Sequence, residues 1–244
     1  MNLNQNKTMS SSASSVKVDA GLRLYMNRVY TLMSMGVGLT GIITYIVATT
    51  PSLLVPLATG PMKWVLFAAV LGLGWMAPNV IMTKSRNTAG MMFWLYSALW
   101  GVMIAPMIAY FLQTQQGALD IARAFLITSA MFGGASIYGY TTKRDLSTFG
   151  RFFMMAGIGL IVAMVVNIFM QSSLFSLGIS AIVVLFCAGM TAYETQMIRN
   201  MYYQLPSGEA VNRFAILGAF MLYGSFITMF IHVLSIMGIM RGND

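Results

Sequence analysis

The sequence has few charged residues and almost no cysteine or histidine, and each shortage excludes a class of protein. Charged residues make up 8% of the 244 residues, whereas soluble domains carry about 25%, so a soluble globular domain is excluded. The lone cysteine, Cys187, cannot form an internal disulfide. Because there is also only one histidine, no Cys or His spacing indicates a zinc site. We therefore expect no metal site and no cofactor.

Catalytic motifs are also missing. The sequence contains no P-loop and no dinucleotide-binding fingerprint. Gly134-Ala135-Ser136 with the distant His232 resembles the nucleophile and base of intramembrane serine proteases, but Ile137 stands where those proteins have a second glycine. We expect a protein that is not an enzyme and has no catalytic residues.

Acidic residues are scarce relative to basic ones, with 6 Asp and Glu against 14 Lys and Arg, which gives a net charge of +8. Basic proteins often bind nucleic acid through a clustered patch. Here the basic residues form no patch and lie at the ends of apolar stretches. We therefore expect no nucleic-acid partner.

Long apolar stretches are what the sequence has in abundance, since 58% of its residues are hydrophobic. Each stretch approaches the roughly 20 residues that a helix needs to cross a bilayer, and unpaired backbone groups in lipid require helices. The sequence predicts an all-α, polytopic membrane protein with seven transmembrane helices in residues 29–240. The expected spans are 29–49, 63–82, 89–112, 118–140, 150–170, 174–199 and 212–238.

Residues 1–28 form a polar N-terminal tail, which we expect to be disordered up to about residue 20. It contains no apolar run of the kind that begins a cleavable signal peptide. The tail and the spans therefore form two segments with a boundary near residue 28.

The distribution of Lys and Arg predicts the orientation in the membrane. Positive residues concentrate on the cytoplasmic side of membrane proteins. That rule places the N-terminus in the cytoplasm and the C-terminus in the periplasm of a bacterial inner membrane. A six-span alternative would place both ends inside and leave one apolar run as a re-entrant segment. Eleven of the 14 basic residues fall on the N-terminal side, and Lys63, Arg123 and Arg241 fall on the other.

Polar side chains inside the spans are the main functional candidates, because they are costly in lipid. Glu194 lies late in the sixth span with Thr191 one turn before it, near the cytoplasmic boundary. Glu194 is either part of an ion path or an interfacial carboxylate balanced by Arg199. Ser225, near mid-depth, and His232 lie seven residues apart on one face of the last span. His232 is either a packing residue or a proton sensor.

Small residues four apart on the fourth span predict close packing against another helix. These pairs are Ser129 with Gly133, Ala130 with Gly134, and Ala135 with Gly139.

Segments spread over most of the chain resemble the Bax inhibitor family, also called the transmembrane Bax inhibitor motif family, and its bacterial inner-membrane branch in particular. The most specific segment is Gly139-Tyr140-Thr141-Thr142-Lys143-Arg144-Asp145-Leu146-Ser147 after Met131-Phe132-Gly133. The other segments are residues 21–30, 95–101, 185–200, 216–219 and 222–223.

The resemblance implies seven helices with the last one central, wrapped by the other six. It also implies a pH-sensitive calcium leak, in which aspartates on the sixth and seventh helices share a proton and close the pore. Residue by residue, Glu194 matches the first aspartate, but Ser225 replaces the second. A latch of two carboxylates therefore cannot form, and we expect a weaker leak with a different pH response.

Three roles stay open for the chain. The first is a cation leak, chiefly for calcium, with a part in the stress response and with a cytoplasmic charge cluster of Lys143, Arg144, Asp145 and Arg199. The second is a modulator or substrate of a membrane-bound ATP-dependent protease, engaged through the polar tail. The third is a transporter of a small solute. In every case the lipid bilayer is a partner. The gate candidates are Glu194, Ser225, Tyr223, Thr191 and His232.

Overall fold

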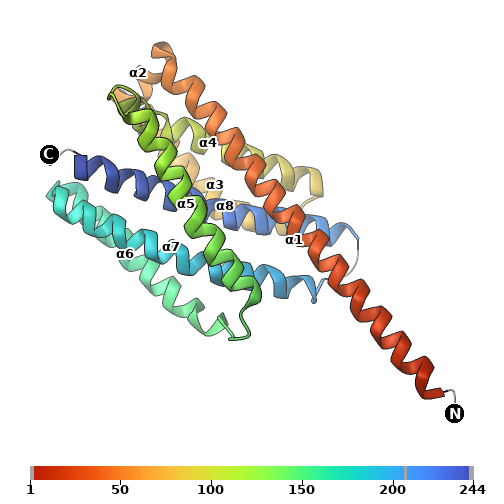
Figure 1. Cartoon of the computed structure of the whole chain (residues 1–244). Helices are drawn as coiled ribbons and strands as arrows, with labels where there is room; N and C mark the ends of the chain where they lie inside the picture. The colour runs from red at the N-terminus through yellow and green to blue at the C-terminus, as the bar shows by residue number, and fades with distance from the viewer. Residues whose placement is uncertain (1–2, 206–207, 242–244) are drawn as a thin grey trace.

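The computed structural model of the chain describes the backbone of residues 3–205 and 208–241, with side chains from Ala20 onward. Eight α-helices and one short 3-10 helix make up nearly all of this part (Figure 1), and it contains no strand. The helices are α1 (Leu3–Thr49), α2 (Pro51–Thr59), α3 (Met62–Thr83), α4 (Arg86–Leu112), α5 (Gly117–Thr141), η1 (Ser147–Phe149), α6 (Gly150–Met170), α7 (Ser173–Tyr202) and α8 (Glu209–Arg241).

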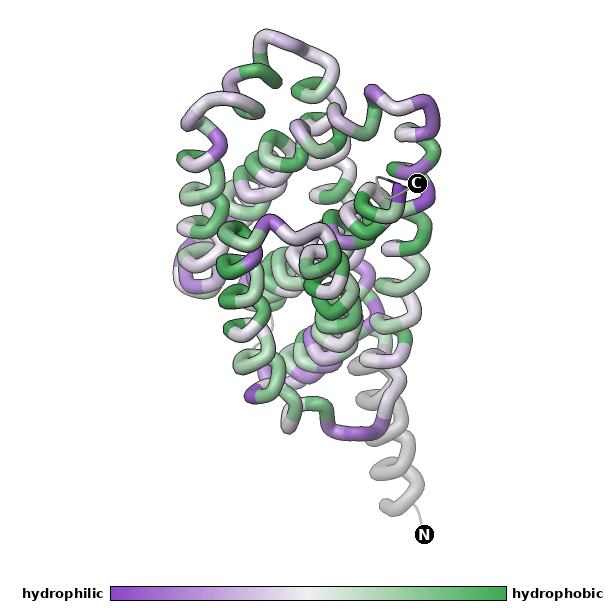
Figure 2. Tube along the Cα trace, turned by 90° about the vertical axis from the view of Figure 1, so that its left-hand side faces the viewer, coloured by the Kyte–Doolittle hydropathy of each residue, from purple (hydrophilic) through white to green (hydrophobic). Residues whose placement is uncertain are grey.

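Seven of the described helices are long and apolar enough to cross a membrane, which confirms the predicted fold class. Figure 2 shows hydrophilic segments mostly in the links at the helix ends, whereas the helices themselves are largely hydrophobic. The six-span alternative is not needed, because every predicted span corresponds to one helix.

The first helix differs from the expectation. Its packed part begins before residue 29, because Leu22, Tyr25 and Met26 are buried in the core of the bundle. These apolar side chains extend the buried face of the helix about two turns beyond the expected start of the span. The backbone is helical from Leu3, so α1 also covers the segment for which we expected disorder.

The short helix α2 was not predicted. It occupies the link before the second span, and Pro51 stands at its first position. A proline fits there because that position has no intrahelical partner for a backbone amide. Leu57 of α2 is buried against Val47 and Ala105, so this link packs on the bundle.

The last helix is the centre of the bundle, as the family resemblance implied. In the most apolar window of α8, 67% of the residues are buried, compared with 0% for α6. α8 packs against α1, α3, α4, α5 and α7 (Figure 1). α6 instead packs on α7 at the edge of the bundle, so five helices surround α8, not the expected six.

One of the three small-residue pairs on α5 marks a close helix contact. A Cβ on Gly139 would collide with the backbone of Ala192 on α7, whereas a Cβ on Gly133 or Gly134 would have no neighbour within 4 Å. The close approach of α5 and α7 therefore depends on Gly139.

We expect Gly139→Ala to lower the free energy of unfolding by about 1–3 kcal/mol, the usual cost of overpacking. The two backbones would have to separate to admit the new methyl group. Thermal unfolding in detergent micelles measures this change. Gly134→Ala is the matched control, because its methyl group enters open space on the same helix. Equal melting temperatures for the two variants would contradict the assignment.

Candidate functional site

The polar contact between Glu194 of α7 and Ser225 of α8 is the centre of the candidate site. The Ser225 hydroxyl donates a hydrogen bond to Glu194 Oε2 over 2.7 Å. Glu194 is 6% exposed, and neither of the ion pairs found among the described side chains includes it. The structure therefore holds a buried carboxylate whose hydrogen-bond partner is a neutral hydroxyl.

This contact brings together two residues that we expected at different depths. Residue counts placed Glu194 near the boundary and Ser225 near mid-depth, but the hydrogen bond puts both at one level. α7 continues to Tyr202, past its expected end at residue 199. Glu194 therefore lies eight residues, roughly 12 Å, inside the end of its helix.

Two other gate candidates lie near this pair but are bonded elsewhere. The Thr191 hydroxyl donates to the Cys187 carbonyl of its own helix over 2.8 Å. The Tyr223 hydroxyl lies 2.7 Å from that of Thr40 on α1, and Thr40 in turn bonds the Ser97 carbonyl on α4 over 2.9 Å. Tyr223 therefore ties α8 to α1, and no hydrogen bond joins it to Glu194 within the described residues.

His232 makes a second polar contact along the same pair of helices. Its Nδ1 lies 3.1 Å from the hydroxyl of Ser180 on α7. Ser225 and His232, which share a face of α8, thus both meet polar partners on α7. The seam between α7 and α8 carries two polar contacts separated by about two helical turns.

The predicted charge cluster does not form ion pairs in the described part of the chain. Arg199 donates to the Tyr140 carbonyl and to the amide oxygen of Asn200, so it does not balance Glu194. Asp145 accepts a hydrogen bond from the backbone amide of Ser147, and this bond lowers the pKa of its carboxyl group. Lys143 and Arg144 are exposed.

Gln196, on α7 near Glu194, holds the loop that carries these charges. Its amide oxygen accepts from the backbone amide of Leu146 over 2.7 Å, and its amide nitrogen donates to the Arg144 carbonyl over 2.8 Å. The loop between α5 and η1 is therefore attached to the helix that carries the buried carboxylate.

Glu194 and Ser225 also border a cavity of about 390 Å³, which we call the side cavity. It lies between α6, α7 and α8, and most of its wall is apolar. Its lining residues are Gly157, Leu160, Ile161, Met164, Val183, Phe186, Cys187, Met190, Glu194, Phe220, Met221, Gly224, Ser225 and Thr228.

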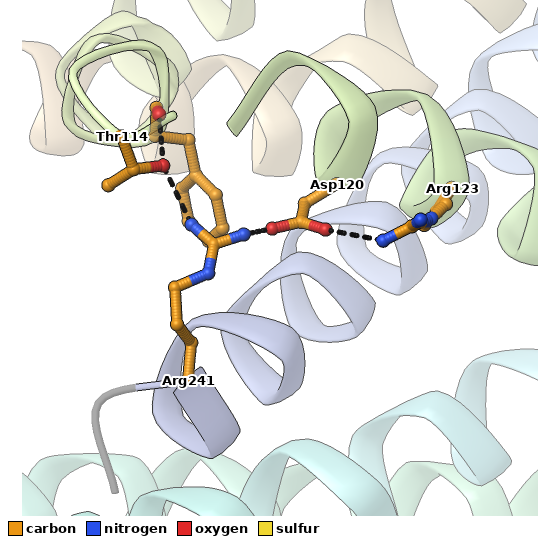
Figure 3. A network of polar contacts seen from close by, with 5 residues as sticks. Thr114, Asp120, Arg123 and Arg241 are labelled. Carbon is orange, nitrogen blue, oxygen red and sulfur yellow. Dashed lines mark hydrogen bonds and ion pairs between the residues drawn. The ribbon is translucent and has the colours of Figure 1, made fainter. Parts of the chain in front are cut away.

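We did not predict from the sequence the charged network at the C-terminal end of α8 (Figure 3). Arg241 pairs with Asp120 of α5 and donates to the Thr114 hydroxyl over 2.7 Å. Asp120 is 4% exposed and also meets Arg123 at 3.2 Å. The sequence did carry a signal for this pair, since Asp120 lies at the start of one span and Arg241 at the end of another, on the same predicted side of the membrane. We had interpreted Arg123 and Arg241 only as markers of span ends.

Comparison with known proteins places the whole bundle within one family. Residues 22–242 match the sequence profile of the family described as "Inhibitor of apoptosis-promoting Bax1". This range includes Glu194, Ser225 and Arg241.

Individual relatives cover nearly the full chain. A protein of Rickettsia prowazekii is 34% identical over 233 residues, which are 95% of this chain and 96% of that protein. Inner membrane protein YbhL of Escherichia coli K12 is 36% identical over 230 residues, 93% of this chain and 96% of its own. A protein of Deinococcus radiodurans is 37% identical over 215 residues, 88% of this chain and 90% of its own.

We expect Arg241→Met to lower the free energy of unfolding by about 2 kcal/mol, because it leaves the buried Asp120 carboxylate without its main partner. Arg123→Met should cost less than about 1 kcal/mol, since ion pairs of exposed side chains contribute little, and the Arg123 side chain is 58% exposed. Chemical unfolding in micelles compares the two variants. Equal losses would show that Arg241 has no special part in holding α8.

Proposed function

The chain belongs to the Bax inhibitor family of integral membrane proteins, and from this premise we propose that it lets cations, chiefly Ca²⁺, leak across the bacterial inner membrane without a catalytic step. The observation that supports this proposal is the hydrogen bond of 2.7 Å between Ser225 and Glu194. It joins the two helix positions at which the resemblance expects the closing contact. The inner-membrane location rests on the name of the relative in Escherichia coli.

The seam between α7 and α8 has the chemistry that a calcium path needs. Ca²⁺ binds carboxylate, hydroxyl and carbonyl oxygens, and Glu194, Ser225 and Thr228 supply such groups next to one another. In the structure the serine hydroxyl is bonded to one carboxylate oxygen. A passing cation would compete for that oxygen, and the seam would have to open for it.

The serine makes this contact different from a pair of carboxylates. Two carboxylates in one site cannot both ionise at low cost, so they share a proton and repel each other when it is lost. A serine hydroxyl carries no charge in either state, so loss of a proton from Glu194 creates no such repulsion. We therefore expect a weaker leak, with a shallower response to pH than two carboxylates would produce.

Calcium flux into liposomes tests the role of the carboxylate. Glu194→Gln should lower the flux about tenfold, which corresponds to roughly 1.4 kcal/mol of lost attraction for the cation. Gln keeps the size of the side chain and can still accept the serine hydrogen bond. An unchanged flux in Glu194→Gln would contradict the proposed path.

The pH response of the flux tests the role of the serine. Ser225→Asp should make the flux rise more steeply between pH 6 and pH 8 than in the native protein, because two carboxylates then separate as their shared proton leaves. Ser225→Asn is the control of similar size without a charge. A native response as steep as that of Ser225→Asp, and abolished by Glu194→Gln, would contradict the proposal.

We also infer that the N-terminus lies in the cytoplasm, since most basic residues lie at that end of the spans. Cys187 is buried and is the sole cysteine, so single-cysteine variants are readily made on a Cys187→Ala background. In spheroplasts, a membrane-impermeant maleimide should label Lys63→Cys directly and Lys143→Cys only after lysis. Both side chains are exposed in the structure, and the reverse labelling pattern would contradict the orientation.

A further inference from the structure

We propose that the side cavity binds a hydrophobic ammonium ion, meaning an amine with an apolar body, whose charge pairs with Glu194. The inference deepens the proposed function, because the ligand would occupy the carboxylate that the leak uses. Three features of the structure support it: a buried carboxyl group without a cationic partner, an apolar wall of suitable size, and access from the lipid.

The first feature is the lack of a cationic partner for Glu194. A buried carboxylate is costly unless a cation balances it, and no Lys, Arg or His lies within ion-pair distance of Glu194 among the described side chains. Its partner, Ser225, is neutral. An ammonium group in the cavity would supply the missing positive charge together with N–H or polarised C–H contacts.

The second feature is the wall of the cavity. Apart from Glu194, Ser225 and Thr228, its lining is hydrophobic, and about 390 Å³ is within the range of small-molecule sites. Three methionines in the wall can adapt to different shapes, and two phenylalanine rings can face a cation. These side chains are Met164, Met190, Met221, Phe186 and Phe220.

The same wall disfavours a bound metal ion. Ca²⁺ takes six to eight oxygen ligands, and the oxygen-bearing side chains that line the cavity are Glu194, Ser225 and Thr228. The cavity therefore suits an organic cation better than a metal ion, and its occupant would hold α7 and α8 together.

The third feature is access from the side of the bundle. α6 packs on α7 but not on α8, and none of its residues is buried. The cavity between α6 and α8 is lined by glycine on both sides. A Cβ on Gly224 would meet nothing within 4 Å, and one on Gly157 would come within 3.5 Å only of the Phe186 ring. A hydrophobic amine could therefore enter from the lipid between these two helices.

Isothermal titration with tetrabutylammonium, on the full chain in nanodiscs, tests the proposal. Tetrabutylammonium should bind at least tenfold more tightly than tetramethylammonium, which carries the charge without the apolar body. Glu194→Gln should weaken binding at least tenfold. Gly224→Leu, which fills the cavity and leaves Glu194 in place, should also weaken binding at least tenfold. Gly157→Leu fills the cavity from the opposite wall, so it provides an independent test if Gly224→Leu does not fold.

Gly159→Leu is the matched control, because Gly159 lies exposed on α6 and its added side chain would also enter open space. Gly159→Leu should bind tetrabutylammonium as tightly as the native protein does. The proposal is overturned if tetrabutylammonium does not bind, which is the result that a lipid chain filling the cavity would give. It is also overturned if binding is unchanged in Glu194→Gln, or unchanged in both Gly224→Leu and Gly157→Leu.

The outcome is separable from that of the proposed function. Binding is measured without any flux, so a protein that conducts no calcium can still show the site. Conversely, a calcium flux that depends on Glu194 but is not reduced by tetrabutylammonium would leave the leak standing and remove the ligand site. If both hold, tetrabutylammonium should inhibit the flux of the native protein at least tenfold more strongly than that of Gly224→Leu.

Discussion

The polar contacts of the central helix are the interactions on which the rest of the bundle depends. Lipid is as apolar as the helices, so close packing and hydrogen bonds must hold a membrane bundle together. α8 meets α1 through Tyr223 and Thr40, α7 through Ser225 and Glu194, and α5 through Arg241 and Asp120. Tyr223 and Ser225 lie in one turn of α8 and Arg241 lies more than four turns further on, so together these contacts fix the rotation and the height of α8.

The proposed path and the proposed ligand site both follow from the unequal strength of these contacts. At the C-terminal end of α8 the buried acid Asp120 has a cationic partner, Arg241. At the middle of α8 the buried acid Glu194 has the hydroxyl of Ser225. Removing a charged partner leaves an unpaired charge in a medium of low dielectric constant, whereas a neutral hydrogen bond is weaker. The hydrogen bond beside Glu194 is therefore expected to break at a lower cost than the ion pair beside Asp120.

The sequence predicted the seven spans and their helical state well, because hydropathy and backbone pairing in lipid leave few alternatives. It also placed Ser225 and His232 on one face of α8, since helical periodicity fixes that relation. It did not reveal the pairing of Asp120 with Arg241, because residues so distant in the sequence meet only through the packing of helices. Arg199 likewise bonds a carbonyl oxygen, and every residue type offers such an acceptor, so no sequence pattern could indicate it.

The attachment of the loop to Gln196 has a consequence outside the membrane. Glu194 and Gln196 share one turn of α7, and the Gln196 side chain is hydrogen-bonded to the backbone of both Leu146 and Arg144. Because of these two hydrogen bonds, a rotation or shift of α7 must either move this exposed, basic loop with it or break the bonds. The interior of the bundle and this exposed loop are thus mechanically linked, so a displacement of the loop is transmitted to the helix that carries the buried acid.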